Sequence, residues 1–190
     1  MKLKSNKLYK SIEAHMPRRA LPAARLAYRA YIKVLCWYAS LQDRRKIEQS
    51  GLAAVPPTSL RYRVHGSPSM EGFLRIGKRC SEDIEAALGK VGRNLDSFED
   101  ILDFGCGCGR TLIWFAERSR SARWYGTDID AEAVSWCRDN LDFAEFGVNG
   151  PFPPLEYASG AFDLVYAISV FTHLDEGYQF RWLEELKRIT

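Results

Sequence analysis

The feature that most constrains this chain is an apolar run that ends in three alternating glycines, ILDFGCGCGRT at residues 101–111. Glycine permits backbone dihedrals that other residues resist, and it lets a ligand approach the backbone closely. The run predicts a short buried strand at 100–104, a glycine loop, and a helix at 110–119 whose first N–H groups are free for a ligand. Gly105, Gly107 and Gly109 are therefore the first candidate binding residues.

Strand and helix patterns alternate through the second half of the chain. Alternation of this kind predicts right-handed βαβ units and a parallel sheet. The strand segments are apolar at nearly every position, as expected when helices cover both faces. The predicted fold class is α/β. Further strands are expected at 123–128, 144–149 and 162–170, with helices at 131–141, capped by Asp130, and at 177–189.

The N-terminal half has a different character. We expect helices at 21–49 and 69–91, the second capped by Ser69, and an extended linker at Pro56-Pro57. Residues 1–50 hold twelve Lys/Arg and three Asp/Glu, a net charge of +9, whereas the remainder carries −6. The predicted organisation is a basic helical extension at 1–55, a lead-in or lid segment at 56–97, and a ligand-binding core at 98–190.

The basic extension has three interpretations. One is a helix that is solvated or packed on protein. A second is peripheral contact with an anionic membrane surface, since Trp37 and Tyr38 lie near a basic stripe of Arg25, Arg29 and Lys33. Nucleic acid ranks third and is not the expected partner, because no recognised nucleic-acid motif accompanies the charge.

Several classes of protein are disfavoured. There is no long apolar run and no signal peptide, so we expect a cytoplasmic location. An odd count of five cysteines without an export signal favours reduced thiols over disulfides. Cys106 and Cys108 are spaced too tightly for the usual zinc pair, and no metal is expected.

Three polar residues mark the ends of the predicted strands: Asp103, Asp128 and Asn149. In an open α/β sheet, ligands bind at this edge, and a carboxylate after the second strand can accept both ribose hydroxyls. A dinucleotide fingerprint would place a third glycine where this chain has Arg110. Asp103 would repel a phosphate, so its position favours a ligand with a positively charged end.

Together these motifs resemble class I S-adenosylmethionine-dependent methyltransferases, which have a Rossmann-like fold. The matching pieces are ILDFGCGCGR, YGTDID, FGVNGPFPPL and FDLVYAISVFTHL, within residues 99–190. The resemblance implies S-adenosylmethionine as cofactor and a methyltransferase activity (EC 2.1.1.-). It implies cofactor contacts from Asp103, Gly105, Cys106, Gly107, Gly109, Asp128, Ile129, Asn149, Gly150, Ala167 and Ser169.

The resemblance also sets the expected limits of the sheet. This chain stops in the helix after the fourth strand, whereas the family sheet continues. We therefore expect a truncated sheet of about four strands in the order 3-2-1-4, and a fragment or truncated gene product. The fourth strand would form an exposed edge. The segment before the core resembles a lid, with Arg61, Phe73 and Gly77 as its candidate residues.

The leading hypothesis is methyl transfer to a small-molecule or saccharide-like acceptor. His173, just after the fourth strand, is the best-placed group to act as a catalytic base, and a local role at a helix start competes with that assignment. Two alternatives remain: a nicotinamide-dependent oxidoreductase, and a non-catalytic membrane or protein adaptor on the same fold.

Overall fold

The computed structural model describes residues 17–50, 54–117 and 122–190. Contacts within the chain divide it into two compact units, one ending at Phe73 and one comprising Leu74–Thr190. Each unit is treated by itself below. The predicted boundaries at residues 55 and 97 stay predictions.

The first unit contains a long helix, α2 (Leu21–Ser50), and a short one, α3 (Thr58–His65). One face of α2 is buried through Tyr28, Ile32 and Cys36, with Tyr62 of α3 packed against it. The Tyr28 and Tyr62 hydroxyls lie 3.1 Å apart. The spacing of four places these α2 residues on one side of the helix, so residues four apart form the contact with α3. The predicted helix at 21–49 is confirmed.

Helix α3 was not expected, because the Pro56-Pro57 pair indicated an extended linker. Pro57 is extended, with φ −52° and ψ 150°, but the next residue already begins the helix. The fixed φ of proline is compatible with a position just before a helix. Gly66 ends α3 at φ 75°, where its N–H donates to the Tyr62 carbonyl. That glycine was the available sequence signal.

Arg61 is a buried anchor of the first unit. Its side chain is 1% exposed. The guanidinium donates to the Asp43 carboxylate, to the Pro56 carbonyl at 2.8 Å and to the Pro68 carbonyl at 3.0 and 3.1 Å. These internal partners engage the guanidinium, and the lid role of Arg61 stays a prediction. Phe73 is fully buried as well.

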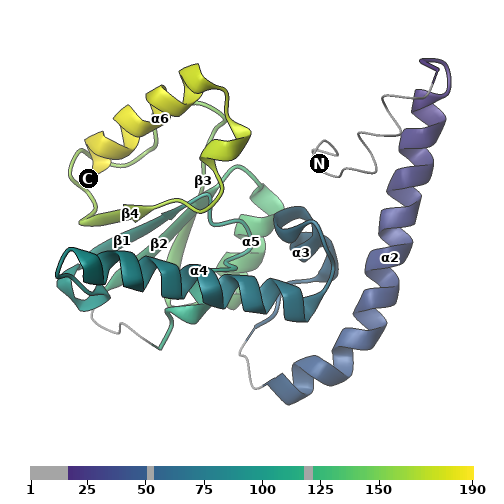
Figure 1. Cartoon of the computed structure of the whole chain (residues 1–190), viewed down its shortest axis with the longest axis horizontal. Helices are drawn as coiled ribbons and strands as arrows, with labels where there is room; N and C mark the ends of the chain where they lie inside the picture. Colours follow the sequence, from purple (N-terminus) through teal and green to yellow (C-terminus); the bar gives the residue numbers. More distant parts are fainter. Residues whose placement is uncertain (1–16, 51–53, 118–121) are drawn as a thin grey trace. The chain divides into compact units, whose positions relative to one another are not determined.

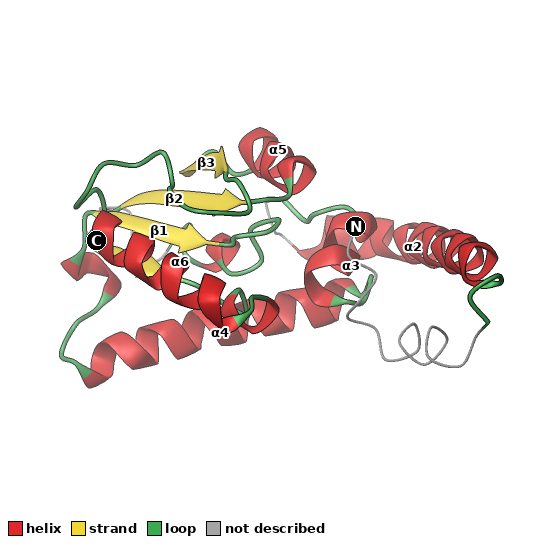
Figure 2. Ribbon diagram, turned by 90° about the horizontal axis from the view of Figure 1, so that it is seen from above, coloured by secondary structure: helices red, strands yellow, loops and turns green. Residues whose placement is uncertain are grey.

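The second unit is built on a four-stranded parallel sheet in the order β3-β2-β1-β4 (Figure 2). This order confirms the prediction. In sequence the strands are β1 (Asp100–Phe104), β2 (Arg123–Asp128), β3 (Ala144–Val148) and β4 (Leu164–Tyr166).

Helices lie on both sides of this sheet: α4 (Met70–Lys90), α5 (Ala131–Asn140) and α6 (Glu176–Ile189). Figure 1 shows α6 on one side of the sheet and α4 on the other. Trp182 and Ile189 of α6 pack with Leu102 and Phe104 of β1 in one buried cluster. Alternation along β1 leaves Ile101 and Asp103 for the opposite face.

Side-chain caps fix where these helices begin. Ser69 Oγ accepts the Gly72 N–H at 3.1 Å before α4, and Asp130 accepts the Ala133 N–H at 3.3 Å before α5. Asp175 accepts the Tyr178 N–H at 3.1 Å before α6. Capping side chains satisfy N–H groups that have no partner within the helix.

The prediction of a helix at 110–119 is wrong for residues 110–117, the part of this segment that the structure describes. Only a 3₁₀ turn, η3 (Leu112–Trp114), forms there. The Trp114 and Phe115 N–H groups donate three residues back, to Thr111 and Leu112. The sequence TLIWF is rich in β-branched and aromatic residues, which favour an α-helix less than straight side chains do.

The predicted fourth strand, 162–170, is also too long. Strand β4 pairs with β1 over three residues only. Before it, the Phe162 N–H donates to the Ile189 carbonyl at 2.9 Å, which ties this segment to the end of α6. After it, Ser169 has φ 62°, a left-handed conformation that a strand cannot contain.

Candidate functional site

The glycine loop after β1 requires glycine at the positions that the sequence singled out. Gly105, Gly107 and Gly109 have φ of 81°, 56° and 73°. A Cβ on Gly105 would lie 2.3 Å from Val170 Cγ2, and one on Gly109 would lie 2.6 Å from Leu141 Cδ1. Positive φ and close packing both exclude larger residues. The loop therefore lies directly against the segment that follows β4.

Strand β2 holds the glycine loop by hydrogen bonds. The Thr127 carbonyl accepts the N–H groups of Gly105 at 2.8 Å and Cys106 at 3.1 Å. The Asp128 Oδ2 atom accepts the Gly107 N–H at 2.8 Å, and Oδ1 accepts the Asp130 N–H at 2.8 Å. Each carboxylate oxygen has two lone pairs, so each keeps one for a further donor. The half-buried Asp128 can therefore accept two hydroxyls of a ribose while it holds the loop.

Two neighbours of Asp128 complete the predicted nucleoside side of the site. Ile129 is 59% exposed, as an apolar residue that flanks a ring would be. The Asn149 N–H donates to the Asp128 carbonyl at 3.1 Å. The Asn149 amide lies 3.0 Å from Thr127 Oγ1 and donates to the Gly150 carbonyl at 2.8 Å. Local partners thus orient this amide, which retains one N–H for a ligand.

Asp103 is the carboxylic acid of the site whose pKa departs furthest from its ordinary value. It is 3% exposed, and burial raises its pKa to about 7. The nearby Asp128 carboxylate also raises this pKa, whereas the Tyr166 hydroxyl and the Arg110 guanidinium lower it. The Tyr166 hydroxyl lies near enough to lower the pKa of Asp103, but the two groups are not aligned as a hydrogen bond. A cationic ligand beside Asp103 would favour the ionised form.

Three buried polar atoms near the loop have no hydrogen-bond partner in the described part of the chain: Arg110 Nε, Trp114 Nε1 and Tyr166 Oη. A buried polar atom without a partner costs free energy, so a water or a polar ligand group is expected beside it. The Asp103 carboxyl and the Tyr166 hydroxyl together fit the amino-acid end of S-adenosylmethionine. The glycine loop and Asp128 fit its ribose.

The cysteines of the loop are packing residues. Cys106 and Cys108 are both buried. A hydrogen bond with the Cys137 thiol, and then burial, raise the pKa of Cys106 well above its ordinary value. A thiol that stays protonated is a poor nucleophile. Within the described residues, no group of three potential ligands could hold a metal ion.

The segment after β4 supplies the remaining predicted residues. Ala167 is half-buried, and Ser169 is exposed in its left-handed conformation. A non-glycine residue with positive φ is uncommon and stores strain that functional sites often use. His173 is exposed at the end of a 3₁₀ turn, η4 (Phe171–His173), and its N–H donates to the Val170 carbonyl at 3.1 Å. Val170 in turn contacts the glycine loop.

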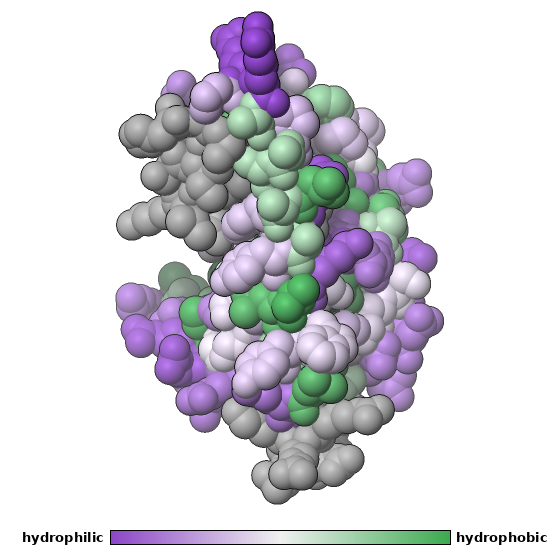
Figure 3. Space-filling view, turned by 90° about the vertical axis from the view of Figure 1, so that its right-hand side faces the viewer, coloured by the Kyte–Doolittle hydropathy of each residue, from purple (hydrophilic) through white to green (hydrophobic). Residues whose placement is uncertain are grey.

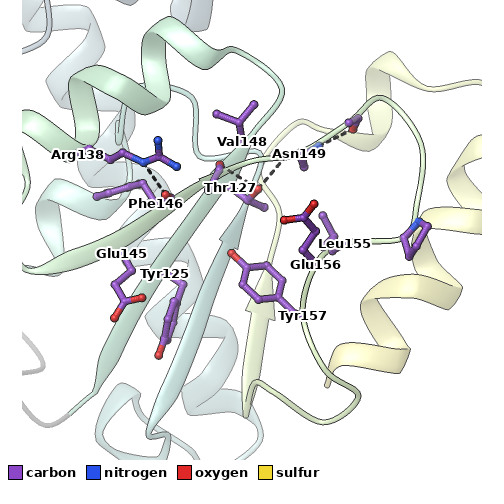
Figure 4. Close-up of a pocket in the computed structure, with 13 residues that line it drawn as sticks. Tyr125, Thr127, Arg138, Glu145, Phe146, Val148, Asn149, Leu155, Glu156 and Tyr157 are labelled. Carbon is purple, nitrogen blue, oxygen red and sulfur yellow. Dashed lines mark hydrogen bonds between the residues drawn. The ribbon is translucent and has the colours of Figure 1, made fainter.

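A cavity of about 530 Å³ lies on one face of β2 and β3 (Figure 4). Of the predicted site residues, Asn149 and Gly150 line it. Tyr125 and Thr127 of β2 and Tyr157 of the following loop face it, and sequence reasoning missed all three. The alternation in RWYGTD could have indicated Tyr125 and Thr127. Tyr157 lies in a loop rich in Pro and Gly that carries no such signal.

Comparison with known proteins shows which proteins this chain resembles. Residues 101–190 match the family described as a methyltransferase domain. A ribosomal protein L11 methyltransferase of Thiobacillus denitrificans is 40% identical over 136 residues, 66% of this chain and 45% of that protein. The chain thus spans less than half the length of this curated relative.

Solved structures with a similar fold include a SAM-dependent methyltransferase from Aquifex aeolicus, with 21% identity and a TM-score of 0.43 over 48% of this chain and 50% of that one. Another is the PH0226 protein from Pyrococcus horikoshii OT3, with 21% identity and a TM-score of 0.49 over 59% of this chain and 52% of that one.

The sheet order, the glycine loop and the acid after β2 define a class I methyltransferase fold of the Rossmann-like kind. Residues 101–190 match the methyltransferase-domain family, a class of proteins whose cofactor is S-adenosylmethionine. No helix in the described ranges is long and apolar enough to cross a bilayer.

Proposed function

We propose that this chain transfers a methyl group from S-adenosylmethionine to a small-molecule or saccharide-like acceptor. The observation that carries the proposal is the Asp128 carboxylate, which holds the Gly107 N–H and keeps acceptor capacity for a ribose. When bound, S-adenosylmethionine supplies a methyl group activated on a sulfonium. The protein supplies binding, orientation and a base.

The residues of the chain divide these tasks. Gly105, Gly107 and Gly109, with Cys106 between them, let the cofactor approach the backbone. Asp103 holds the cationic amine of the methionine end, and Asp128 holds the ribose. Ile129, Asn149 and Gly150 surround the adenine, and Ala167 and Ser169 line the methyl-donor pocket. His173 accepts the proton of a hydroxyl or amine acceptor.

The acceptor class has its own test. The name of the relative, ribosomal protein L11 methyltransferase, indicates that its methyl acceptor is a protein. A protein acceptor is therefore the second candidate. Cell extract would be divided by ultrafiltration and incubated with the chain and S-adenosylmethionine that carries a labelled methyl group. Label in the small-molecule fraction supports the proposal. Label in protein alone would replace it with the second candidate.

Cofactor binding is tested by calorimetric titration with S-adenosylhomocysteine, with NADH as the control. One-site binding of S-adenosylhomocysteine without binding of NADH supports the proposal. Binding of NADH alone would favour the oxidoreductase alternative, which Arg110 disfavours because it stands where a dinucleotide loop needs its third glycine. Binding of neither ligand by a folded chain would refute both.

A further inference from the structure

Helix α2 has a second apolar face that is exposed to water. Leu26, Val34, Trp37 and Leu41 are 70%, 61%, 62% and 53% exposed. At 100° per residue these four side chains fall within one quadrant of the helix. Tyr31 and Tyr38, 55% and 57% exposed, widen the same face. We call this set of six residues the apolar face of α2.

The apolar face lies opposite the side of α2 that packs on α3. Tyr28, Ile32 and Cys36 form that packed side, and on the helical wheel they are centred roughly half a turn away from Val34 and Leu41. Within the first unit, α2 therefore packs on α3 through the side opposite to the apolar face. Figure 3 shows one face of the molecule, on which hydrophobic residues gather among hydrophilic ones.

Positive charge borders the apolar face. Arg25, Arg29 and Lys33 are exposed and recur every four residues. On the helical wheel Lys33 borders the apolar face, Arg29 lies between that face and the packed side, and Arg25 lies at the packed side. Residues 17–42 contain five Lys/Arg and no Asp/Glu. A surface that covers the apolar face would therefore meet the Lys33 end of this cationic stripe first, with Arg29 next to it.

We propose that α2 lies on a bilayer surface that carries anionic headgroups. Leu26, Val34, Trp37 and Leu41 would enter the boundary between headgroups and acyl chains, and the cationic stripe would meet the headgroups. Helices that lie in this interface combine a broad apolar face with Lys/Arg and aromatic residues. Trp and Tyr suit the boundary because each has an apolar ring and a polar group.

Charge distinguishes a bilayer from other occupants of the apolar face. A second copy of α2 would bring two cationic stripes together, with no acid in residues 17–42 to pair with them. Nucleic acid would neutralise the stripe but would leave Leu26, Val34 and Leu41 in water. An anionic bilayer satisfies both the charge and the apolar side chains.

The test is co-sedimentation of the full chain with vesicles of phosphatidylcholine, with and without phosphatidylglycerol. One variant removes charge (Arg25→Gln, Arg29→Gln, Lys33→Gln), and its control changes exposed cations of α4 (Lys78→Gln, Arg79→Gln, Lys90→Gln). A second variant removes apolar surface (Val34→Ser, Trp37→Ser, Leu41→Ser). Its control changes equally exposed positions elsewhere (Val91→Ser, Phe180→Ser, Leu183→Ser).

We expect binding to the phosphatidylglycerol vesicles only, weaker at high salt. Each Lys or Arg near an anionic surface contributes about 1 kcal/mol, so the charge variant should bind on the order of a hundredfold more weakly. The apolar variant should lose at least tenfold, and both controls should match the wild type. The proposal is independent of methyl transfer, and S-adenosylhomocysteine affinity should be equal in all variants.

Three results would overturn the proposal. The first is no co-sedimentation at low salt. The second is vesicle binding that the charge variant loses and the apolar variant keeps. That result would mean electrostatic adsorption without insertion of the apolar face. An oligonucleotide titration would then test nucleic acid as the partner. The third is self-association in sedimentation equilibrium that the apolar variant abolishes, without vesicle binding, which would assign the apolar face to a second copy of the chain.

Discussion

Gly77 of α4 lies against the backbone carbonyl of Arg110, just after the glycine loop. A Cβ on Gly77 would stand 2.1 Å from that oxygen and 2.8 Å from Trp114 Nε1. Helix α4 therefore packs directly on the backbone of the segment that follows the glycine loop. Gly77 is thus a close-packing site within the second unit, and its expected lid role stays a prediction.

Gly77→Ala should destabilise the chain by about 1–3 kcal/mol, since the added methyl group overlaps a backbone atom that cannot move freely. Urea unfolding measures this loss. The control is Gly89→Ala on the same helix, where nothing lies within 4 Å of the added Cβ. Alanine there should stabilise by about 0.5–1 kcal/mol. Equal stability of the two variants would mean that the contact of α4 with Arg110 is not tight.

Asp128→Asn should weaken S-adenosylhomocysteine binding at least tenfold, because an amide nitrogen replaces one of the two acceptor oxygens. Calorimetry gives the affinity. Asp130→Asn is the matched control: it removes the same charge two residues away, and Asn caps a helix about as well as Asp. If both variants lost affinity equally, net charge rather than the ribose contact would explain the effect. His173→Ala should leave this affinity unchanged.

The raised pKa of Asp103 predicts a pH dependence of stability. Its pKa is about 7 in the folded chain and near the ordinary value of 3.8 when unfolded. Between these values the native state binds more protons than the unfolded state, so the contribution of Asp103 to stability falls as pH rises from about 4 to about 7. Urea unfolding across this range, wild type minus Asp103→Asn, should show the decline. A difference that stays constant with pH would refute it.

Arg61→Lys should loosen the first unit locally. A lysine keeps the charge but lacks the planar fork of donors that reaches Asp43, Pro56 and Pro68 together, so hydrogen bonds of this buried site are lost. Hydrogen exchange of the α3 amides should accelerate, while β1 and β2 amides stay protected. Arg79→Lys, at a side chain 76% exposed, is the control and should change neither. Unchanged α3 exchange would show that Arg61 is not an anchor.

The parallel sheet could be predicted from the alternation of strand and helix patterns, whereas its strand order was implied by the family resemblance. Two further signals have local causes. The glycines after Phe104 and the cap at Asp130 act through their own backbone and the next few residues. Asp163 is a different case: its carboxylate accepts the N–H groups of Asp100 and Glu99, which lie more than 60 positions away, and these bonds lower its pKa.

The remaining features depend on contacts between distant parts of the chain. Strand β4 is short because Phe162 bonds to Ile189 of α6 instead of to a strand. The burial of Arg61 depends on Asp43, which is 18 positions away. The cavity needs Tyr157 to lie beside Thr127, and neither sequence segment shows that. In each case pairing across the fold overrides the local pattern.

Thr127 has one consequence for how the two halves of the site communicate. Its carbonyl holds the N–H groups of Gly105 and Cys106, and its hydroxyl reaches the Asn149 side chain at the cavity. The residue is 2% exposed and paired on both sides within the sheet. Thr127 therefore links the glycine loop to the cavity, next to Asp128, whose carbonyl accepts the Asn149 N–H and whose carboxylate accepts the Gly107 N–H. A molecule that displaced Asn149 would act on the loop through these two neighbouring residues.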